Sequence, residues 1–267
     1  MKILACFKVT RDFENITPSE LCALRDGVLN LSPFKRIIGA YDEAALETSR
    51  RFADKVRQSN VCTLHALTVG ECEPRFAKDI YAVGFDKVIR VHPDSGRERG
   101  PEETASYICG FIESAGGYDM IFSGLQAWPG ESGLTPYFIA KRLSIPCIPQ
   151  IIEVWPCEGG ARAVSKTDTG KFTRTVRAPA VYIVGEALHP YLKIATLREK
   201  VAAGDKSVYD ATIKISPVGR GSKQAGKLLY ENTGRQCRFI EGKSTAAKAE
   251  ALWREIKRFA QEPEFYL

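Results

Sequence analysis

The stretch of sequence that decides the fold is DMIFSGLQAWPGESGLTPYFIAKRL, residues 119–143. Its apolar start, Asp119 to Ser123, predicts a short buried strand, and its end, from about Leu134 to Leu143, has the spacing of a helix. Between them lies a loop with three glycines, Gly124 to Thr135. A strand that leads through a glycine-bearing loop into a helix predicts an α/β protein with a ligand site beyond the end of the strand.

The loop contains the residue types of an anion site. Backbone N–H groups are free at the start of a helix, and the helix dipole favours negative charge there. Gly124, Gly130 and Gly133 let such N–H groups approach a phosphate, and Ser132 adds a hydroxyl donor. The same glycines also suit a plain tight turn, and the Gly-Lys-Ser/Thr of a Walker loop is missing, so both interpretations stay open on the glycines alone.

Upstream of this stretch, apolar runs alternate with segments of helical periodicity. The predicted strands are Lys2–Val9, Val61–Val69, Lys87–His92 and Asp119–Ser123. The predicted helices are Asp42–Val56, Glu73–Val83 and Glu102–Ala115, with Gly116-Gly117 as the exit from the third. This alternation predicts parallel strands with right-handed crossovers, hence a doubly wound sheet. Ligands bind such sheets where strands lead into helices, which here selects the loops Phe7–Phe13, Val69–Glu73 and Gly124–Thr135.

Downstream, the pattern changes to close-set strands separated by Gly159-Gly160 and Thr169-Gly170. These predict an antiparallel meander of Pro146–Val154, Arg162–Thr167, Phe172–Val176 and Ala180–Val184. A helical piece around Ile194–Ala203, a Gly-, Ser- and Lys-rich stretch and an amphipathic helix, Thr245–Gln261, follow. Residues 1–204 are therefore expected to form a nucleotide-binding α/β domain. Residues 205–267 are expected to form an extended tail that packs on another surface, because they have too little apolar surface to fold alone.

Composition narrows the class of protein. The 267 residues are 44% hydrophobic and 26% charged, which is typical of a globular protein. The eight cysteines include no CxxC pair and the three histidines are isolated, so reduced thiols and no metal site are expected. The net charge of +6 comes from bases interleaved with acids, so we predict no nucleic-acid site. Without a signal peptide or an apolar run of about 20 residues, no transmembrane segment and a cytoplasmic location are expected.

The sequence contains no recognisable catalytic constellation. His65 lies inside a predicted strand, and His92 and His189 each precede a proline. No Ser or Cys stands in an elbow motif, and no HExxH or paired carboxylate pattern occurs. A nucleotide-type loop without catalytic groups predicts a protein that holds a cofactor, so that the chemistry belongs to the cofactor and the chain is not itself an enzyme.

Several stretches, in order, resemble the β subunit of electron transfer flavoproteins, including the branch linked to nitrogen fixation and carnitine. They are MKILACFKVT at 1–10, GAYDEAALE at 39–47, ALTVG at 66–70, GLQAWPGESGLTPYFIA at 124–140, VRAPAVYIV at 176–184 and KVAAGDKSV at 200–208. Each match is moderate, but their order and spacing are specific, and they cover roughly the first four-fifths of the chain.

The resemblance implies an adenine-nucleotide-hydrolase-like sheet and a heterodimer with a larger α subunit that carries most of the FAD site. It also implies AMP or a second FAD in this chain. Such a complex relays electrons between a dehydrogenase and a quinone- or ferredoxin-linked acceptor such as a quinone oxidoreductase. The tail, residues 205–267, would pack on the α subunit.

Site residues follow from the resemblance by position. The implied nucleotide contacts are Cys6, Gly39, Ala40, Tyr41, Asp42, Val69, Gly124, Leu125, Gln126, Ala127, Trp128, Gly130, Glu131, Ser132, Gly133, Leu134 and Thr135. Phe13 and Tyr41 are implied to approach the flavin of the α subunit. The implied docking residues for a partner dehydrogenase are His189, Pro190, Tyr191, Leu192, Ile194, Arg198 and Lys200, a mixture of apolar and basic side chains that suits a transient interface.

The loop also departs from the family pattern. Pro129 stands where the family has an acid, Leu134 where it has a glutamine, and Gly39-Ala40 replaces an Asn-Pro pair. Backbone amides can still hold a phosphate, so a nucleotide stays compatible while its identity stays open. Two alternatives remain. One is a stand-alone adenine-nucleotide sensor of the universal stress protein type. The other, a nucleic-acid-binding protein, rests on charge alone.

Overall fold

The structure is a computed structural model that describes residues 1–12, 34–93, 99–128, 130–216 and 239–261. The chain divides into two compact units, Met1–Lys223 and Gln224–Leu267, and each is described by itself. Among the described residues, no helix combines the length and the apolar character needed to cross a membrane.

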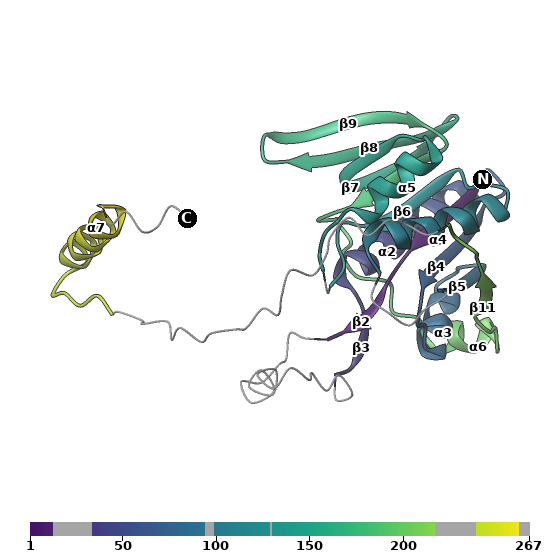
Figure 1. The fold of residues 1–267 in the computed structure, drawn as a ribbon, viewed down its shortest axis with the longest axis horizontal. Helices are drawn as coiled ribbons and strands as arrows, with labels where there is room; N and C mark the ends of the chain where they lie inside the picture. The colour runs from purple at the N-terminus through teal and green to yellow at the C-terminus, as the bar shows by residue number, and fades with distance from the viewer. Residues whose placement is uncertain (13–33, 94–98, 129, 217–238, 262–267) are drawn as a thin grey trace. The chain divides into compact units, whose positions relative to one another are not determined.

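The first unit is built on a mostly parallel sheet. Over the described residues, its nine strands have the order β11-β5-β4-β1-β6-β10-β7-β8-β9 (Figure 1). They are β1 (Lys2–Cys6), β4 (Thr63–Val69), β5 (Lys87–His92), β6 (Met120–Gly124), β7 (Cys147–Cys157), β8 (Gly160–Thr167), β9 (Gly170–Arg177), β10 (Ala180–Val184) and β11 (Tyr209–Thr212). The strands from β11 to β7 pair in parallel, and β8 and β9 are antiparallel additions. The predicted α/β class with an antiparallel extension is confirmed.

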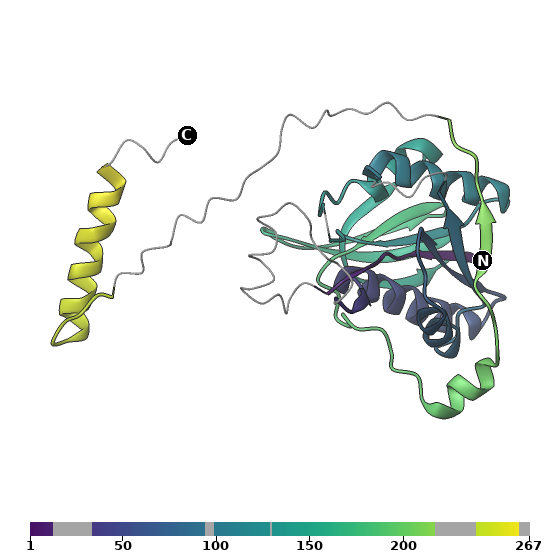
Figure 2. The ribbon, with the colours of Figure 1, turned by 60° about the horizontal axis from the view of Figure 1, so that its bottom comes forward.

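Helices cover both faces of the sheet, as expected for a doubly wound fold. They are α2 (Ala40–Arg57), α3 (Pro74–Ala82), α4 (Pro101–Ser114), α5 (Thr135–Leu143) and α6 (Leu197–Ala203). Helices α2 and α3 lie on one side of the sheet, and α4 and α5 lie on the other (Figure 2). Because successive strand residues point to opposite faces, Ile3 packs towards α2 while Leu4 packs towards α4 and α5.

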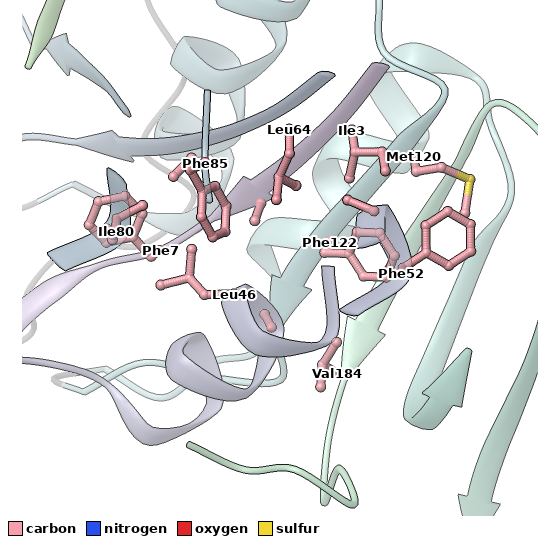
Figure 3. Close-up of a cluster of buried hydrophobic side chains, with 14 of the residues drawn as sticks. Ile3, Phe7, Leu46, Phe52, Leu64, Ile80, Phe85, Met120, Phe122 and Val184 are labelled. Atoms are coloured by element: carbon pink, nitrogen blue, oxygen red, sulfur yellow. The ribbon is translucent and has the colours of Figure 1, made fainter. Parts of the chain in front are cut away.

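The core beneath α2 is aromatic. Phe122 of β6 contacts Phe52 of α2 at a ring-centroid distance of 5.9 Å (Figure 3), and it stacks on Tyr182 of β10 at 5.3 Å. All three side chains are almost completely buried, so Phe122 and Phe52 each contribute roughly 1.5–3 kcal/mol to stability through burial of apolar surface, while the buried Tyr182 hydroxyl has no hydrogen-bond partner among the described residues, which reduces the gain there. This packing fixes α2 against the middle of the sheet, where the candidate site lies.

The exit of α4 confirms the interpretation of Gly116-Gly117 as a helix cap. The N–H of Gly116 donates to the Glu113 carbonyl at 3.1 Å, and that of Gly117 donates to the Ile112 carbonyl at 2.9 Å. Both glycines have positive φ, 75° and 85°, which is costly for other residues. The pair therefore ends a helix before β6, as expected, and the cap leaves no phosphate-binding role for it.

Two strand predictions were wrong in their details. The predicted strand Lys2–Val9 divides into β1 and a separate β2 (Val9–Arg11), which pairs antiparallel with β3 (Arg36–Ile38). The run Ala180–Val184 is not the last strand of a meander, because β10 inserts in parallel between β6 and β7. All five residues of β10 are buried, and a continuous apolar run is typical of a parallel strand covered on both faces.

The stretch after Gly204, for which no strand is predicted, supplies β11 at the edge of the sheet. Arg90 of β5 donates two hydrogen bonds to Asp210 of β11, at 2.6 and 2.9 Å, and fixes the added strand. These bonds hold the pKa of Asp210 down at about 2. In the second unit, the predicted helix is confirmed as α7 (Thr245–Gln261).

Candidate functional site

The topology of the sheet places a candidate ligand site between β1 and β6. From β1 the chain adds β4 and β5 on one side, and then returns to add β6 on the other side. The connections that leave β1 and β6 run to opposite faces, which opens a crevice beyond the carboxyl ends of these strands. A cavity of about 580 Å³ lies at this point. Its lining comes from the loops after β1, β5 and β6, the end of β4 and the start of α2.

Three helices, α2, α4 and α5, begin at this cavity. Asp42 of the first turn of α2, Pro101 of α4 and Thr135 of α5 all line it. None of the three helices has a side-chain hydrogen bond at its N-cap residue. Their first-turn N–H groups and the positive ends of their dipoles therefore favour an anion in this cavity.

Helix α2 begins directly against the end of β6. A Cβ atom added to Gly124 would lie 2.5 Å from Asp42 Oδ1, 2.7 Å from the carbonyl carbon of Tyr41 and 2.9 Å from the Asp42 nitrogen. Side chains do not tolerate such approaches to backbone atoms, so this position requires glycine. The sequence indicates that Gly124 lets amides approach a ligand, and the structure adds that it lets α2 start close to β6.

Asp42 joins the loops that follow β1 and β6. Its Oδ2 accepts a hydrogen bond from the Lys8 backbone N–H at 2.9 Å, and the Gly124 backbone N–H lies close enough to act on its pKa. The residue is only 5% exposed. Burial raises the pKa of Asp42 to about 7, although these N–H groups and the Lys8 charge act in the opposite direction. The charge on this wall of the cavity therefore changes near neutral pH.

This titration predicts a pH dependence of anion binding. Because the pKa of Asp42 is raised to about 7, the side chain is mostly neutral below that pH and mostly negative above it. A negative wall disfavours a bound phosphate, so we expect affinity for an adenine nucleotide to fall by about tenfold from pH 6 to pH 8. Calorimetric titration of the wild type and of Asp42→Asn at both pH values measures this effect. If the wild type and Asp42→Asn bind the nucleotide with equal affinity at both pH 6 and pH 8, this prediction is wrong.

Three residues of the glycine-bearing loop have positive φ. Gly130, Glu131 and Gly133 have φ values of 100°, 39° and 63°. A Cβ on Gly133 would lie 3.0 Å from the Leu125 carbonyl oxygen, so the loop folds tightly back on itself. Residues with positive φ occur in turns that bind anions through backbone N–H groups, and in this loop the Glu131 N–H is already bonded to the Ala127 carbonyl at 3.2 Å.

Most of the predicted nucleotide contacts lie at the cavity. Those in its lining are Cys6, Asp42, Val69, Gly124, Leu125, Gln126, Ala127, Gly130, Glu131, Ser132, Gly133 and Thr135. Those not in its lining are Gly39, Ala40, Tyr41, Trp128 and Leu134. Trp128 supports the loop from outside, since its carbonyl accepts a hydrogen bond from Thr10 Oγ1 at 2.8 Å. Phe13 lies outside the described residues.

Sequence analysis did not predict the residues of one wall of the cavity. The loop after β5 contributes Arg99 and Gly100 to the lining, and the start of α4 contributes Pro101 and Thr104. Arg99 Nη2 would lie 3.0 Å from a Cβ at Gly70, which places this cation beside the end of β4. The signal was present in the predicted strand Lys87–His92, because all parallel strands end at the same edge of a sheet. Phe7 and Lys8 belong to the predicted ligand loop Phe7–Phe13, and the other lining residues missed are Leu67, Ile108, Ser123 and Pro136.

The lining contains no activated nucleophile. Cys6 lies in the wall at 6% exposure, and burial raises the pKa of its thiol far above its usual range. It therefore stays protonated, as expected for a buried thiol that packs as a small apolar group. Within the residues that the structure describes, no cluster of His, Cys, Asp and Glu is arranged to hold a metal ion. The arrangement suits the binding of an anion.

The predicted docking residues lie apart from the cavity lining, in the segment before and within α6. Tyr191, Ile194 and Leu197 are 73%, 89% and 79% exposed, which is unusual for large apolar side chains in one short segment. His189, Pro190 and Arg198 are also exposed. Leu192 differs, because it is half-buried and packs against the core. Lys200 pairs with Asp79 of α3 at 2.5 Å.

Comparison with known proteins places the chain in a family. The family model of the electron transfer flavoprotein domain matches residues 30–206, about two thirds of the chain. A protein of Escherichia coli (strain K12) named as the electron transfer flavoprotein subunit YgcR is 24% identical over 266 residues, which cover 98% of this chain and 100% of that protein. The acryloyl-CoA reductase electron transfer subunit gamma of Anaerotignum propionicum is 31% identical over 152 residues, 55% of this chain and 53% of that subunit. The matched region contains α2, the cavity loops after β5 and β6 and the exposed segment, and the chain belongs to the electron transfer flavoprotein family.

Proposed function

We propose that the chain is the β-type subunit of an electron transfer flavoprotein heterodimer and holds an adenine nucleotide in its cavity. The observation that carries this proposal is the convergence of three helix starts without side-chain caps on one cavity at the switch point of the sheet. Family membership supplies the redox context. The complex would relay electrons in the cytoplasm between a dehydrogenase and a quinone- or ferredoxin-linked acceptor.

The lining fits an adenosine phosphate. Leu67, Val69 and Ile108 provide apolar surface for a base, while Lys8 and Arg99 and the loop amides provide donors and positive charge for phosphates. AMP and FAD share this portion, so the proposal covers AMP or a second FAD. A bound flavin supplies the redox chemistry, and the residues of this chain bind it, orient it and exclude water from it. None of them needs to perform acid–base catalysis.

Two exposed elements suit a partner subunit that carries most of the FAD site. Strand β9 is the edge of the sheet, and all its residues except Val176 are exposed. An open strand edge is a template for contacts with another chain. In α7, Leu252, Trp253 and Ile256 are 48%, 56% and 48% exposed within their own unit. We propose that the α-type subunit covers both surfaces.

The exposed segment at residues 189–200, hereafter the docking segment, would contact the dehydrogenase. Large apolar side chains beside basic ones are typical of transient interfaces. The relative named as an electron transfer subunit of acryloyl-CoA reductase supports an acyl-CoA-type dehydrogenase as the partner. Tyr41 is proposed to lie on the side of the chain that meets the flavin of the α-type subunit.

Co-purification tests the proposal. A tagged copy of this chain, produced together with an α-type subunit from the same genome, is expected to yield a 1:1 yellow complex with a flavin absorption spectrum. The chain produced alone is expected to lack that spectrum. A chain that is stable alone as a homodimer, binds ATP and retains no α-type subunit would instead favour the stress-protein-type sensor, which the family match does not favour.

A further inference from the structure

Helix α2 carries two carboxylates, one turn apart, that hold the docking segment. The Glu47 carboxylate accepts the backbone N–H of Lys193 at 3.1 Å, through Oε2. The Glu43 carboxylate, one turn earlier on α2, lies near the backbone N–H of Leu192, which acts to lower its pKa against the effect of burial. Two acids spaced i and i+4 on a rigid helix thus face consecutive amides of an irregular segment, and Glu47 makes the hydrogen bond.

Glu47 is itself fixed by a buried arginine. Arg50 donates from Nε to Glu47 Oε2 at 2.8 Å and from Nη2 to Glu47 Oε1 at 2.6 Å, a bidentate pair. Glu47 is 4% exposed and Arg50 is 9% exposed, so the pair is shielded from solvent. Arg50 Nη1 also bonds Asp54 at 2.7 Å, which aligns the guanidinium. A buried bidentate pair leaves the Glu47 carboxylate little freedom, so the acceptor for Lys193 is preorganised.

In the docking segment, some side chains pack against the core and their neighbours project to solvent. Leu192 and Ala195 pack inward against the core beneath α2. Tyr191 and Ile194, their neighbours in sequence, are among the most exposed apolar residues described. Holding the backbone at Leu192 and Lys193 therefore fixes which side chains project outward, at a low entropic cost on binding.

We propose that Glu43 and Glu47 form a carboxylate clamp that positions the docking segment, and so act as positioning residues for partner binding. The role in partner binding rests on the proposed function, whereas the clamp itself does not. Because α2 also places Asp42 in the cavity wall, one helix orients both the cavity and the docking segment.

Hydrogen exchange of the full-length chain tests the clamp without any partner. In Glu43→Ala and Glu47→Ala, exchange at the Leu192 and Lys193 amides is expected to accelerate by about tenfold or more, because hydrogen bonds to charged groups are strong. Chymotrypsin cleavage after Tyr191 or Leu192 should accelerate in parallel. Glu43→Gln retains an acceptor oxygen and should restore slow exchange. Glu113→Ala removes an exposed carboxylate from α4, on the other face of the sheet, and serves as the matched control.

The outcomes separate the clamp from the wider function. Unchanged exchange at Leu192 and Lys193 in both alanine variants would overturn the proposal, and so would acceleration spread equally through β1 and β6. If Glu47→Ala does not fold because Arg50 loses its partner, Glu43→Ala decides the result alone. Faster local exchange in a chain that never binds a dehydrogenase would support the clamp and count against the docking role.

Discussion

Replacing Gly124 by alanine is expected to lower the melting temperature by about 6–12 °C, since overpacking against immobile atoms costs about 3 kcal/mol or more. The added methyl group would lie within 2.9 Å of three atoms of Tyr41 and Asp42, two of which belong to the backbone. Relief requires that α2 move away from β6, which would open the wall that Asp42 and Gly124 form together. Loss of the bound nucleotide should therefore accompany the loss of stability, as seen by thermal denaturation and by analysis of the released ligand.

Gly39→Ser is the matched control for stability. Gly39 has φ of −61°, and a Cβ there would meet its nearest atom, Asp42 Oδ2, at an ordinary 3.6 Å. A serine also provides the side-chain N-cap that α2 lacks, so a melting temperature equal to or above that of the wild type is expected. A Gly124→Ala protein that melts with the wild type and keeps its ligand would show that α2 does not fix the cavity.

Placing charge on the docking segment is expected to reduce electron transfer by at least about 30-fold, because central apolar contacts contribute about 2 kcal/mol or more each. The variant Ile194→Asp/Leu197→Asp changes two side chains that are 89% and 79% exposed. Folding should therefore be unaffected, and the loss should appear in the concentration dependence of flavin reduction by the dehydrogenase. The unimolecular rate within the preformed complex should change little.

Val61→Asp is the control for this pair. Val61 is 87% exposed. It precedes β4 and so lies at the amino ends of the parallel strands, whereas the cavity lies at their carboxyl ends. It introduces the same chemical change on a surface that has no proposed partner. Equal losses in both variants, or no loss in the Ile194→Asp/Leu197→Asp variant, would argue that the docking segment does not contact the dehydrogenase.

The fold was predictable where periodicity and turn chemistry agree. The strand Lys87–His92 and the helix Thr245–Gln261 were predicted to the residue, because apolar spacing and flanking polar residues define both ends. The position of Ala180–Val184 was not predictable from its spacing. A short connection after β9 suggests an antiparallel neighbour, whereas tertiary packing inserts this strand between β6 and β7. Its continuous apolar character was the signal that should have taken precedence.

The parts of the candidate site that are contiguous in sequence were predictable, but the residues that only the tertiary fold brings to it were not. The loop Gly124–Thr135 stands out through its glycines, and the resemblance extends to Cys6, Asp42 and Val69. The wall formed by Arg99 to Thr104 depends on which strands end beside β1, and that order is a tertiary property. Likewise, the contacts of Glu43 and Glu47 with Leu192 and Lys193 join residues almost 150 positions apart, which no local pattern encodes.

The central claim is that the cavity between β1 and β6 holds an adenine nucleotide within an electron transfer flavoprotein complex. Its most direct test is mass spectrometry of the small molecules released on denaturing the purified complex, quantified per copy of this chain. We expect one equivalent of AMP or FAD beyond the flavin of the partner subunit, and less of it in Gly124→Ala. A wild-type complex that releases no adenine nucleotide beyond that flavin would contradict it.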